Sequence, residues 1–331
     1  MRVLLVSPRF HGYWRSIAAA LSAAGHQVRA HPYDQRSAGA LVAHKLGREL
    51  PARLAGRPAT GAEGTLTRRA VALLRESRPE AVVVVRGDGL GPAFYEELDA
   101  ARVPRVLWLY DEVRRTGWSP ETLRAVGPVA TYSPLDAAAL GLRYLPLAFD
   151  PAVADLHQVA RTDDVVFIGA RYLSREEVLV GLQAAGVPVR AFGRDWSRHL
   201  LDRARTWGGA RPGVPSGRDV SRAEGYRLMA GAGGALNLHG DQDGFTMRTF
   251  EASGVGGLQL LDRDDVGELY EPGVELLTFT GVEELVDLVR RARHEPGWAE
   301  TVRARGRERT LAEHTFAHRV GVLEELWSTW G

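Results

Sequence analysis

A cation and a carboxylate lie one helical turn apart in the stretch Asp243 to Leu261 (DGFTMRTFEASGVGGLQLL). A glycine-containing loop there opens onto a helix that we expect to begin near Thr246. The free amides at a helix N-terminus, together with the positive end of the helix dipole, form a site for an anion. Arg248, in the first turn, would add a planar guanidinium to it. The segment is therefore a candidate phosphate-binding site.

Glu251 follows Arg248 by three residues. A carboxylate that accepts hydrogen bonds from two adjacent hydroxyls is one way in which a protein grips a ribose. A phosphate site followed by such a carboxylate suggests a nucleoside diphosphate. The same spacing also fits an ion pair between positions i and i+3 on the surface of a helix. Both interpretations are compatible with the spacing.

Short apolar strands alternate with helices along the whole chain, which predicts an α/β protein with parallel sheets covered by helices on both faces. The clearest strand candidates are Arg2 to Ser7, Ala81 to Arg86, Arg105 to Tyr110 and Val165 to Gly169. The pattern restarts after a polar stretch from Asp150 to Asp164. We therefore predict two doubly wound domains, residues 1–155 and 156–316, followed by an amphipathic helix at 317–331.

The composition excludes several classes of protein. The 331 residues include 42 basic and 41 acidic side chains, and this balance argues against a nucleic-acid-binding protein. The lack of cysteine excludes disulfides, thiolate zinc sites and cysteine nucleophiles. Lys45 is the one lysine and lies in no phosphate-binding motif. Apolar runs are too short for a transmembrane segment, and the first residues lack a signal-peptide pattern, so we expect a cytoplasmic protein.

A dinucleotide cofactor is disfavoured by the loops that follow the first strand of each half. A Rossmann fingerprint needs G-x-G-x-x-G between strand and helix. The loop Pro8 to Tyr13 contains one glycine, and the loop Gly169 to Tyr172 also lacks the pattern. We therefore predict no nicotinamide or flavin cofactor.

The stretch from Asp243 resembles the E-x7-E segment of GT-B glycosyltransferases. Asp243 and Glu251 are separated by seven residues, and Gly244-Phe245 matches the Gly-Phe of that segment. The stretch departs from the segment at Asp243, where glutamate is usual, and at Arg248, where proline is usual. Arg248 with Phe250-Glu251-Ala252 is instead similar to the CgeB-like, spore-maturation-protein-type subfamily. Further segments similar to that subfamily are Asn237 with His239, Gly273 with Phe279, and His314 to Phe316 with Arg319.

The resemblance implies a GT-B fold, in which two Rossmann-like domains face each other across a cleft. It implies a glycosyltransferase whose co-substrate, a nucleotide-diphosphate sugar, binds the second domain. The acceptor, a small molecule or a cell-surface glycan, would bind the first. The residues expected to bind the donor are Gly169, Arg171, Asp243, Gly244, Phe245, Thr246, Arg248 and Glu251. The nucleotide base should lie near Gly193-Arg194 and Gly217-Arg218.

A metal-dependent sugar transferase would hold the diphosphate through an Asp-x-Asp pair. The one candidate, Asp262-Arg263-Asp264, is more simply the N-terminal cap of a following helix. We therefore expect a metal-independent site, in which loop amides, Arg248 and Arg171 take the charge of the leaving diphosphate. His239 fits a role facing the cleft and a hydrogen-bonded structural role equally well.

Three residues at strand ends of the first half have the chemistry to take a proton from an acceptor. We rank Asp111 first, then His11, then Asp88. Each also suits a solvated turn or a helix cap. Two other functions fit the same donor residues: a non-catalytic nucleotide-sugar-binding or structural protein, and a GT-B-fold sugar-nucleotide epimerase.

Overall fold

The computed structural model describes residues 1–34, 63–154, 156, 159–199, 202 and 212–330. The chain forms two compact units, Met1–Pro146 with Phe316–Gly331, and Leu147–Thr315. The C-terminal helix thus belongs to the first unit. The boundary expected at 155/156 lies later along the chain than the division at 146/147. Residue 155 and Lys45 lie outside the described residues.

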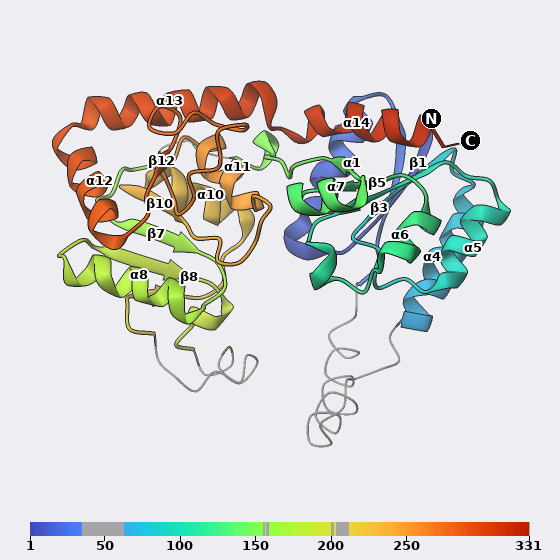
Figure 1. Ribbon diagram of the computed structural model, residues 1–331, viewed down its shortest axis with the longest axis horizontal. Helices are drawn as coiled ribbons and strands as arrows, with labels where there is room; N and C mark the ends of the chain where they lie inside the picture. The colour runs from blue at the N-terminus through green and yellow to red at the C-terminus, as the bar shows by residue number, and fades with distance from the viewer. Residues whose placement is uncertain (35–62, 155, 157–158, 200–201, 203–211, 331) are drawn as a thin grey trace, which may run out of the picture. The chain divides into compact units, whose positions relative to one another are not determined.

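The first unit is built on a parallel six-stranded sheet with the strand order β2-β1-β3-β4-β5-β6 (Figure 1). Its strands are β1 (Arg2–Ser7), β2 (Gln27–Pro32), β3 (Ala81–Val85), β4 (Arg105–Leu109), β5 (Val129–Thr131) and β6 (Arg143–Tyr144). Its helices are α1 (Tyr13–Ala23), α4 (Glu63–Ser77), α5 (Pro92–Ala100), α6 (Pro120–Val126), α7 (Pro134–Leu140) and α14 (Phe316–Ser328). Strands β3 and β4 are buried along their whole length, as their continuous apolar sequences predict.

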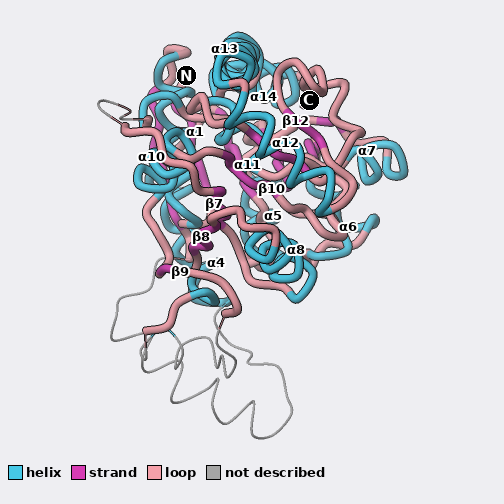
Figure 2. The backbone as a smooth tube through the Cα atoms, turned by 90° about the vertical axis from the view of Figure 1, so that its left-hand side faces the viewer, coloured by secondary structure: helices cyan, strands magenta, loops and turns pink. Residues whose placement is uncertain are grey.

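The second unit repeats this architecture, with the strand order β12-β11-β10-β7-β8-β9. Its strands are β7 (Val165–Ile168), β8 (Val189–Phe192), β9 (Ser216–Gly217), β10 (Gly234–Asn237), β11 (Gln259–Leu261) and β12 (Leu277–Thr278). Its helices are α8 (Leu173–Ala184), α10 (Arg222–Gly231), α11 (Met247–Gly254), α12 (Val282–His294) and α13 (Pro296–Glu313). Figure 2 shows these helices arranged around β7, β8 and β10.

Two glycines of the second unit mark close approaches, one at the end of α11 and one in α13. A Cβ atom at Gly254 would lie 2.6 Å from the ring of Phe149, and one at Gly306 of α13 would lie 2.2 Å from the carbonyl oxygen of Glu275. Only glycine allows both contacts, because the added carbon would overlap its neighbours. The end of α11 therefore packs directly against Phe149.

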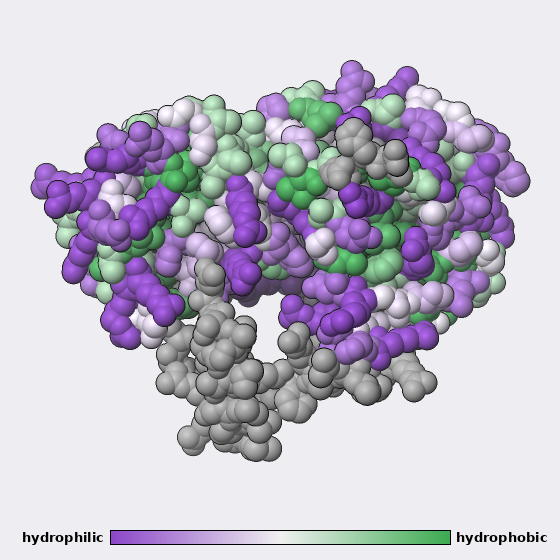
Figure 3. All heavy atoms as spheres, turned by 180° about the vertical axis from the view of Figure 1, so that it is seen from behind, coloured by the Kyte–Doolittle hydropathy of each residue, from purple (hydrophilic) through white to green (hydrophobic). Residues whose placement is uncertain are grey.

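Hydrophilic and apolar side chains alternate over the face of the molecule seen in Figure 3. This pattern is normal for a folded domain, because much of any protein surface is apolar. Among the described helices, we find none that combines the length and the apolar character needed to cross a membrane.

Candidate functional site

In the second unit, the strand order changes direction between β7 and β10, which are neighbours in the sheet. Ligands of open α/β sheets bind outside the carboxyl ends of the strands at such a switch point. The loop 169–172 after β7 and the loop 238–246 after β10 flank it. The residues predicted to bind the sugar, diphosphate and ribose of a donor lie in these two loops or in α11, which follows the second loop. The segments predicted to lie near the base, Gly193-Arg194 and Gly217-Arg218, come after β8 and at β9.

The N-terminus of α11 lies in the loop that follows β10. Thr246 is its N-cap residue, with an extended backbone, and the Thr246 side chain makes no capping hydrogen bond. The Thr246 N–H lies 3.4 Å from Nε2 of His239. Because the first amides of a helix have no partner within it, this end of α11 suits a phosphate or another anion.

Arg248 and Glu251 form an ion pair that is not a surface pair. Nη1 of Arg248 lies 2.7 Å from Oε2 of Glu251, and the Tyr226 hydroxyl donates to Oε1 at 3.2 Å. Glu251 is fully buried, whereas the Arg248 side chain is 25% exposed. A buried carboxylate needs its cation, so Glu251 fixes the guanidinium. Nε and Nη2 of Arg248 have no hydrogen-bond partner within the described ranges.

His239 has a fully buried side chain, tied to the loop after β11. Asp262 accepts hydrogen bonds from the His239 backbone N–H at 2.8 Å and lies 3.1 Å from its Nδ1. The expectation that Asp262 caps a helix is wrong, because residues 264–270 form turns and its carboxylate is used by His239. This contact favours the structural role for His239. It also fixes the loop that precedes α11.

Phe245 points into the protein. Its ring is 5% exposed and lies between the His239 ring, at 5.5 Å, and the Arg263 guanidinium, 4.1 Å from its centroid. Arg263 also donates to the Gln242 carbonyl at 2.9 Å. A hydrogen bond from Arg263 lowers the pKa of Asp265 below its ordinary value. A ligand could therefore contact the backbone around Phe245 rather than its ring. Asp243 and Thr246 are partly exposed beside it.

Arg171, the expected second phosphate cation, is bound by Glu176 in the first turns of α8. Its Nε and Nη2 donate to the two carboxylate oxygens at 2.9 and 3.0 Å. The two side chains are 18% and 14% exposed. A phosphate at Arg171 would therefore share the guanidinium with Glu176. The sequence pattern did not predict this pair.

Arg175 was not singled out by the sequence, yet it joins the two loops of the switch point. Its Nη1 donates to the Ala170 carbonyl at 3.1 Å, and its Nη2 donates to the Leu238 carbonyl at 2.6 Å. Gly169 is fixed on the other side, because its carbonyl accepts a hydrogen bond from Nε1 of Trp196 at 3.0 Å. An arginine in a helix carries no sequence signal for such a role, since its acceptors are backbone atoms.

In the first unit the strand order changes direction between β1 and β3, and His11 and Asp88 follow these two strands. His11 is exposed, with a left-handed backbone (φ 44°), and its ring lies 4.5 Å from that of Phe10. Asp88 and Asp111 are brought together by Arg86, at 2.9 and 3.3 Å. Burial lowers the pKa of Arg86, but the two carboxylates outweigh it and the pKa is raised.

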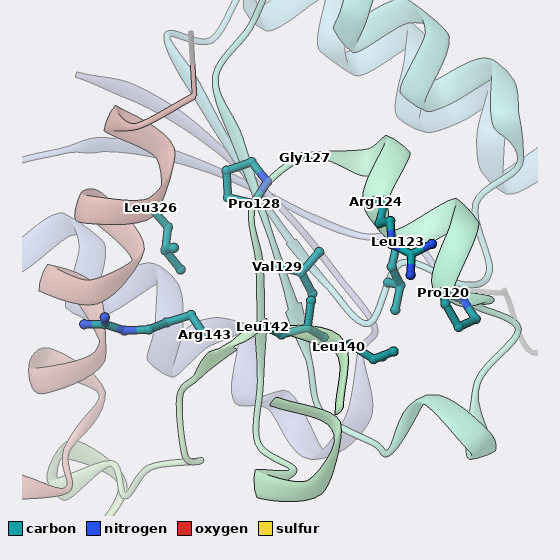
Figure 4. A pocket seen from close by; sticks show the side chains of 11 residues that line it. Pro120, Leu123, Arg124, Gly127, Pro128, Val129, Leu140, Leu142, Arg143 and Leu326 are labelled. Atoms are coloured by element: carbon teal, nitrogen blue, oxygen red, sulfur yellow. The ribbon is translucent and has the colours of Figure 1, made fainter. Parts of the chain in front are cut away.

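A pocket of about 520 Å³ lies elsewhere in the first unit (Figure 4). Its walls are residues before β5 and β6, the ends of α6 and α7, and Leu326 of α14; Leu123, Val129 and Leu140 are gathered around it. It therefore lies at the amino ends of strands. The candidate residues lie at the carboxyl ends, so this pocket is separate from them.

Comparison with known proteins identifies the fold. Residues 175–325 match a family model described as glycosyl transferase-like. No curated protein matches the chain by sequence. Similar solved structures include HepE of Anabaena in complex with UDP-glucose, with 15% identity, 99% of this chain and 100% of that chain covered, and a TM-score of 0.63.

Two further structures are similar over the whole chain. Sucrose-phosphate synthase from Thermosynechococcus elongatus has 15% identity, full coverage of both chains and a TM-score of 0.66. AviGT4, a glycosyltransferase involved in avilamycin A biosynthesis, has 16% identity, covers 100% of this chain and 98% of its own, and has a TM-score of 0.64. Together with the two parallel six-stranded sheets, these similarities confirm the predicted GT-B fold.

Proposed function

We propose that the protein is a metal-independent glycosyltransferase that moves a sugar from a nucleotide-diphosphate donor to a hydroxyl or amine of an acceptor. The observation that carries the proposal is the N-terminus of α11 with Arg248 fixed by the buried Glu251. This site lies at the switch point of a GT-B unit. The match of residues 175–325 to a glycosyl transferase-like family supports it, and so does the fold shared with a UDP-glucose complex. The CgeB-like resemblance and a cytoplasmic location belong to the same proposal.

In this proposal residues 156–316 bind the donor. The amides around Gly244 and Thr246, together with Arg248, bind the diphosphate, and Asp243 binds the sugar. Gly169 and Arg171 approach the phosphates from the other loop. Preorganised amides and cations stabilise the negative charge that develops on the leaving diphosphate without a metal.

Glu251 is proposed to bind the ribose, a contact it would share with the hydrogen bond from Tyr226 and the ion pair with Arg248. Residues 1–155 are proposed to bind the acceptor. Its proton would go to one of the residues at the carboxyl edge of the first sheet, with Asp111 ranked before His11 and Asp88.

A thermal-shift screen against UDP-, TDP-, GDP- and ADP-sugars tests donor binding. A ligand at 100 times its dissociation constant stabilises the native state by about 2.7 kcal/mol. We expect at least one nucleotide to raise the melting temperature by several degrees, and EDTA to leave this rise in place. The matched nucleoside, which lacks the phosphates, should give a much smaller rise. If none of the nucleotides changes the melting temperature, the donor site is wrongly assigned.

A further inference from the structure

We propose that Arg86 is the positioning residue of the acceptor site: it holds Asp88 and Asp111 together and leaves one oxygen of Asp111 to receive the acceptor's proton. This inference rests on the proposed function. Arg86 follows β3 directly, and Asp111 lies just beyond β4. The two strands are neighbours, with Val85 opposite Trp108, so both loops leave the sheet at the same edge.

The guanidinium of Arg86 spans the two loops. Its Nε donates to Oδ1 of Asp88 at 2.9 Å, and its Nη1 lies 3.3 Å from Oδ2 of Asp111. A guanidinium is planar, and its donors have a fixed arrangement. The Arg86 guanidinium therefore sets the separation of the two carboxylates, and its positive charge offsets part of their negative charge.

The backbone of Arg86 is fixed from both sides. Its N–H donates to the Trp108 carbonyl at 2.8 Å, and its carbonyl accepts a hydrogen bond from Nε1 of Trp118 at 2.7 Å. Its φ of 64° is left-handed, a conformation that is uncommon outside glycine. These hydrogen bonds hold the arginine backbone in that conformation, and they fix the point from which its side chain reaches the two carboxylates.

The two carboxylates differ in how many of their oxygens already have a hydrogen-bond partner. Asp88 has both oxygens engaged, Oδ1 by Arg86 and Oδ2 by the Gly117 N–H at 3.3 Å, and its side chain is 15% exposed. Asp111 is 33% exposed, and Arg86 approaches its Oδ2 at 3.3 Å. Its Oδ1 has no hydrogen-bond partner within the described parts of the chain. In this proposal, Asp111 Oδ1 is therefore the oxygen that receives the acceptor's proton.

Tyr33 is an ionisable group next to Asp88, and it does not compete for the proton. Its side chain is buried. Burial raises the pKa of the Tyr33 hydroxyl, and the charge of Asp88 raises it further. Tyr33 therefore stays protonated at neutral pH and cannot accept a proton from the acceptor.

The proposed step is a direct displacement. The acceptor's O–H bond breaks and its proton goes to Asp111 Oδ1, while the acceptor oxygen forms a bond to the anomeric carbon. The bond from that carbon to the diphosphate breaks, and its electron pair leaves on the diphosphate oxygen. Arg86 takes no proton in this step, since it acts through the position and charge of Asp111.

Chemical labelling of carboxyl groups tests whether Arg86 holds Asp88 and Asp111 in place, and it does not depend on turnover. Carbodiimide with glycinamide, read by mass spectrometry, should label Asp111 and spare Asp88 in the wild type. Arg86→Gly removes the fork while allowing the left-handed backbone, and should raise Asp88 labelling several-fold. Arg78→Gly is the matched control, because Arg78 is an exposed arginine with φ 42°. Equal labelling of both aspartates in the wild type, or unchanged Asp88 labelling in Arg86→Gly, would show that Arg86 does not hold the two carboxylates.

Turnover of UDP-glucose with p-nitrophenyl β-D-glucoside tests the positioning role. Because displacement of a catalytic group by about 1 Å can cost about 10²-fold, we expect Arg86→Gly to lower kcat by about that factor. The dissociation constant of UDP should stay within about twofold of the wild-type value. Arg86→Lys keeps the charge and should recover part of the rate.

Wild-type kcat in Arg86→Gly would overturn the positioning role. A wild-type protein that binds none of the UDP-, TDP-, GDP- and ADP-sugars and transfers no sugar from them would instead remove the proposed function. With the labelling pattern as expected, that result would leave the contacts of Arg86 with the two carboxylates in place. The two failures are thus distinguishable. Loss of UDP binding in Arg86→Gly would also count against the role, because the donor residues lie in the other unit.

Discussion

Replacing Asp111 with asparagine is expected to lower turnover by about 10²–10⁴-fold, the range for loss of a general base. The substitution keeps the shape of the side chain and removes the oxygen that receives the proton. Affinity for the nucleoside diphosphate should not change, because its binding residues lie in the second unit. Steady-state kinetics and calorimetric titration with UDP measure the two quantities separately.

Asp88→Asn is the matched control. Asparagine keeps one acceptor oxygen, which can still take the hydrogen bond from Arg86, and loses the weaker bond from the Gly117 N–H at 3.3 Å. We therefore expect a smaller loss of turnover than in Asp111→Asn. His11→Ala completes the comparison, because His11 is exposed after β1. Wild-type turnover in all three variants, with an inverted anomer in the product, would show that the acceptor's proton goes elsewhere.

Arg248→Ala is expected to weaken binding of UDP and UDP-glucose alike, because both ligands carry the diphosphate. Hydrogen bonds to charged groups contribute about 1.5–3 kcal/mol, which corresponds to a loss of affinity of about 10- to 100-fold. The variant also leaves Glu251 buried without its cation. Removing one partner of a buried pair costs at most about 3–5 kcal/mol here, since Arg248 is itself partly exposed.

The double variant Arg248→Ala/Glu251→Gln separates these two effects. A neutral amide at position 251 removes the buried charge and can still accept the hydrogen bond from Tyr226. Denaturant unfolding should show recovery of stability relative to Arg248→Ala. Calorimetry should show a UDP affinity well below that of Glu251→Gln alone, because that single variant loses the proposed ribose contact but keeps Arg248. If affinity recovers together with stability, Arg248 does not contact the phosphates and the pair is structural only.

The fold was largely predictable because its strands are continuous apolar runs. The segments around β3, β4 and β7 carry β-branched and apolar residues bounded by turns, and both faces of such strands are buried. Helix α11 was predictable for a related reason, since a glycine-containing loop precedes it. These are local patterns, and each is complete within a dozen residues.

The contacts that organise the candidate site were not predictable, because they join residues that are distant in the sequence. Asp262 was expected to cap a helix, since an acidic residue before an apolar stretch is typical of a cap. In the structure its carboxylate binds His239 across neighbouring strands. Arg86 was not singled out, because its role depends on the pairing of β3 with β4.

The fate of Arg171 illustrates the same point. Its place after β7 was predicted correctly, but its pairing with Glu176 was not. Side-chain partners within one loop and helix depend on the angle at which the helix leaves the sheet. A sequence pattern carries little information about that angle. A basic residue at a strand end therefore indicates a candidate position for a phosphate, but it does not show that the side chain lacks a partner within the protein.

Product analysis tests the central claim most directly. The protein, with EDTA, the best donor from the thermal screen and a panel of alkyl and aryl glycosides, would be followed by NMR of the anomeric protons and by mass spectrometry. The account predicts equal amounts of nucleoside diphosphate and glycosylated acceptor. Donor that binds but is recovered unchanged would identify a non-catalytic binding protein, and an epimerised sugar nucleotide would identify an epimerase; either result would contradict it.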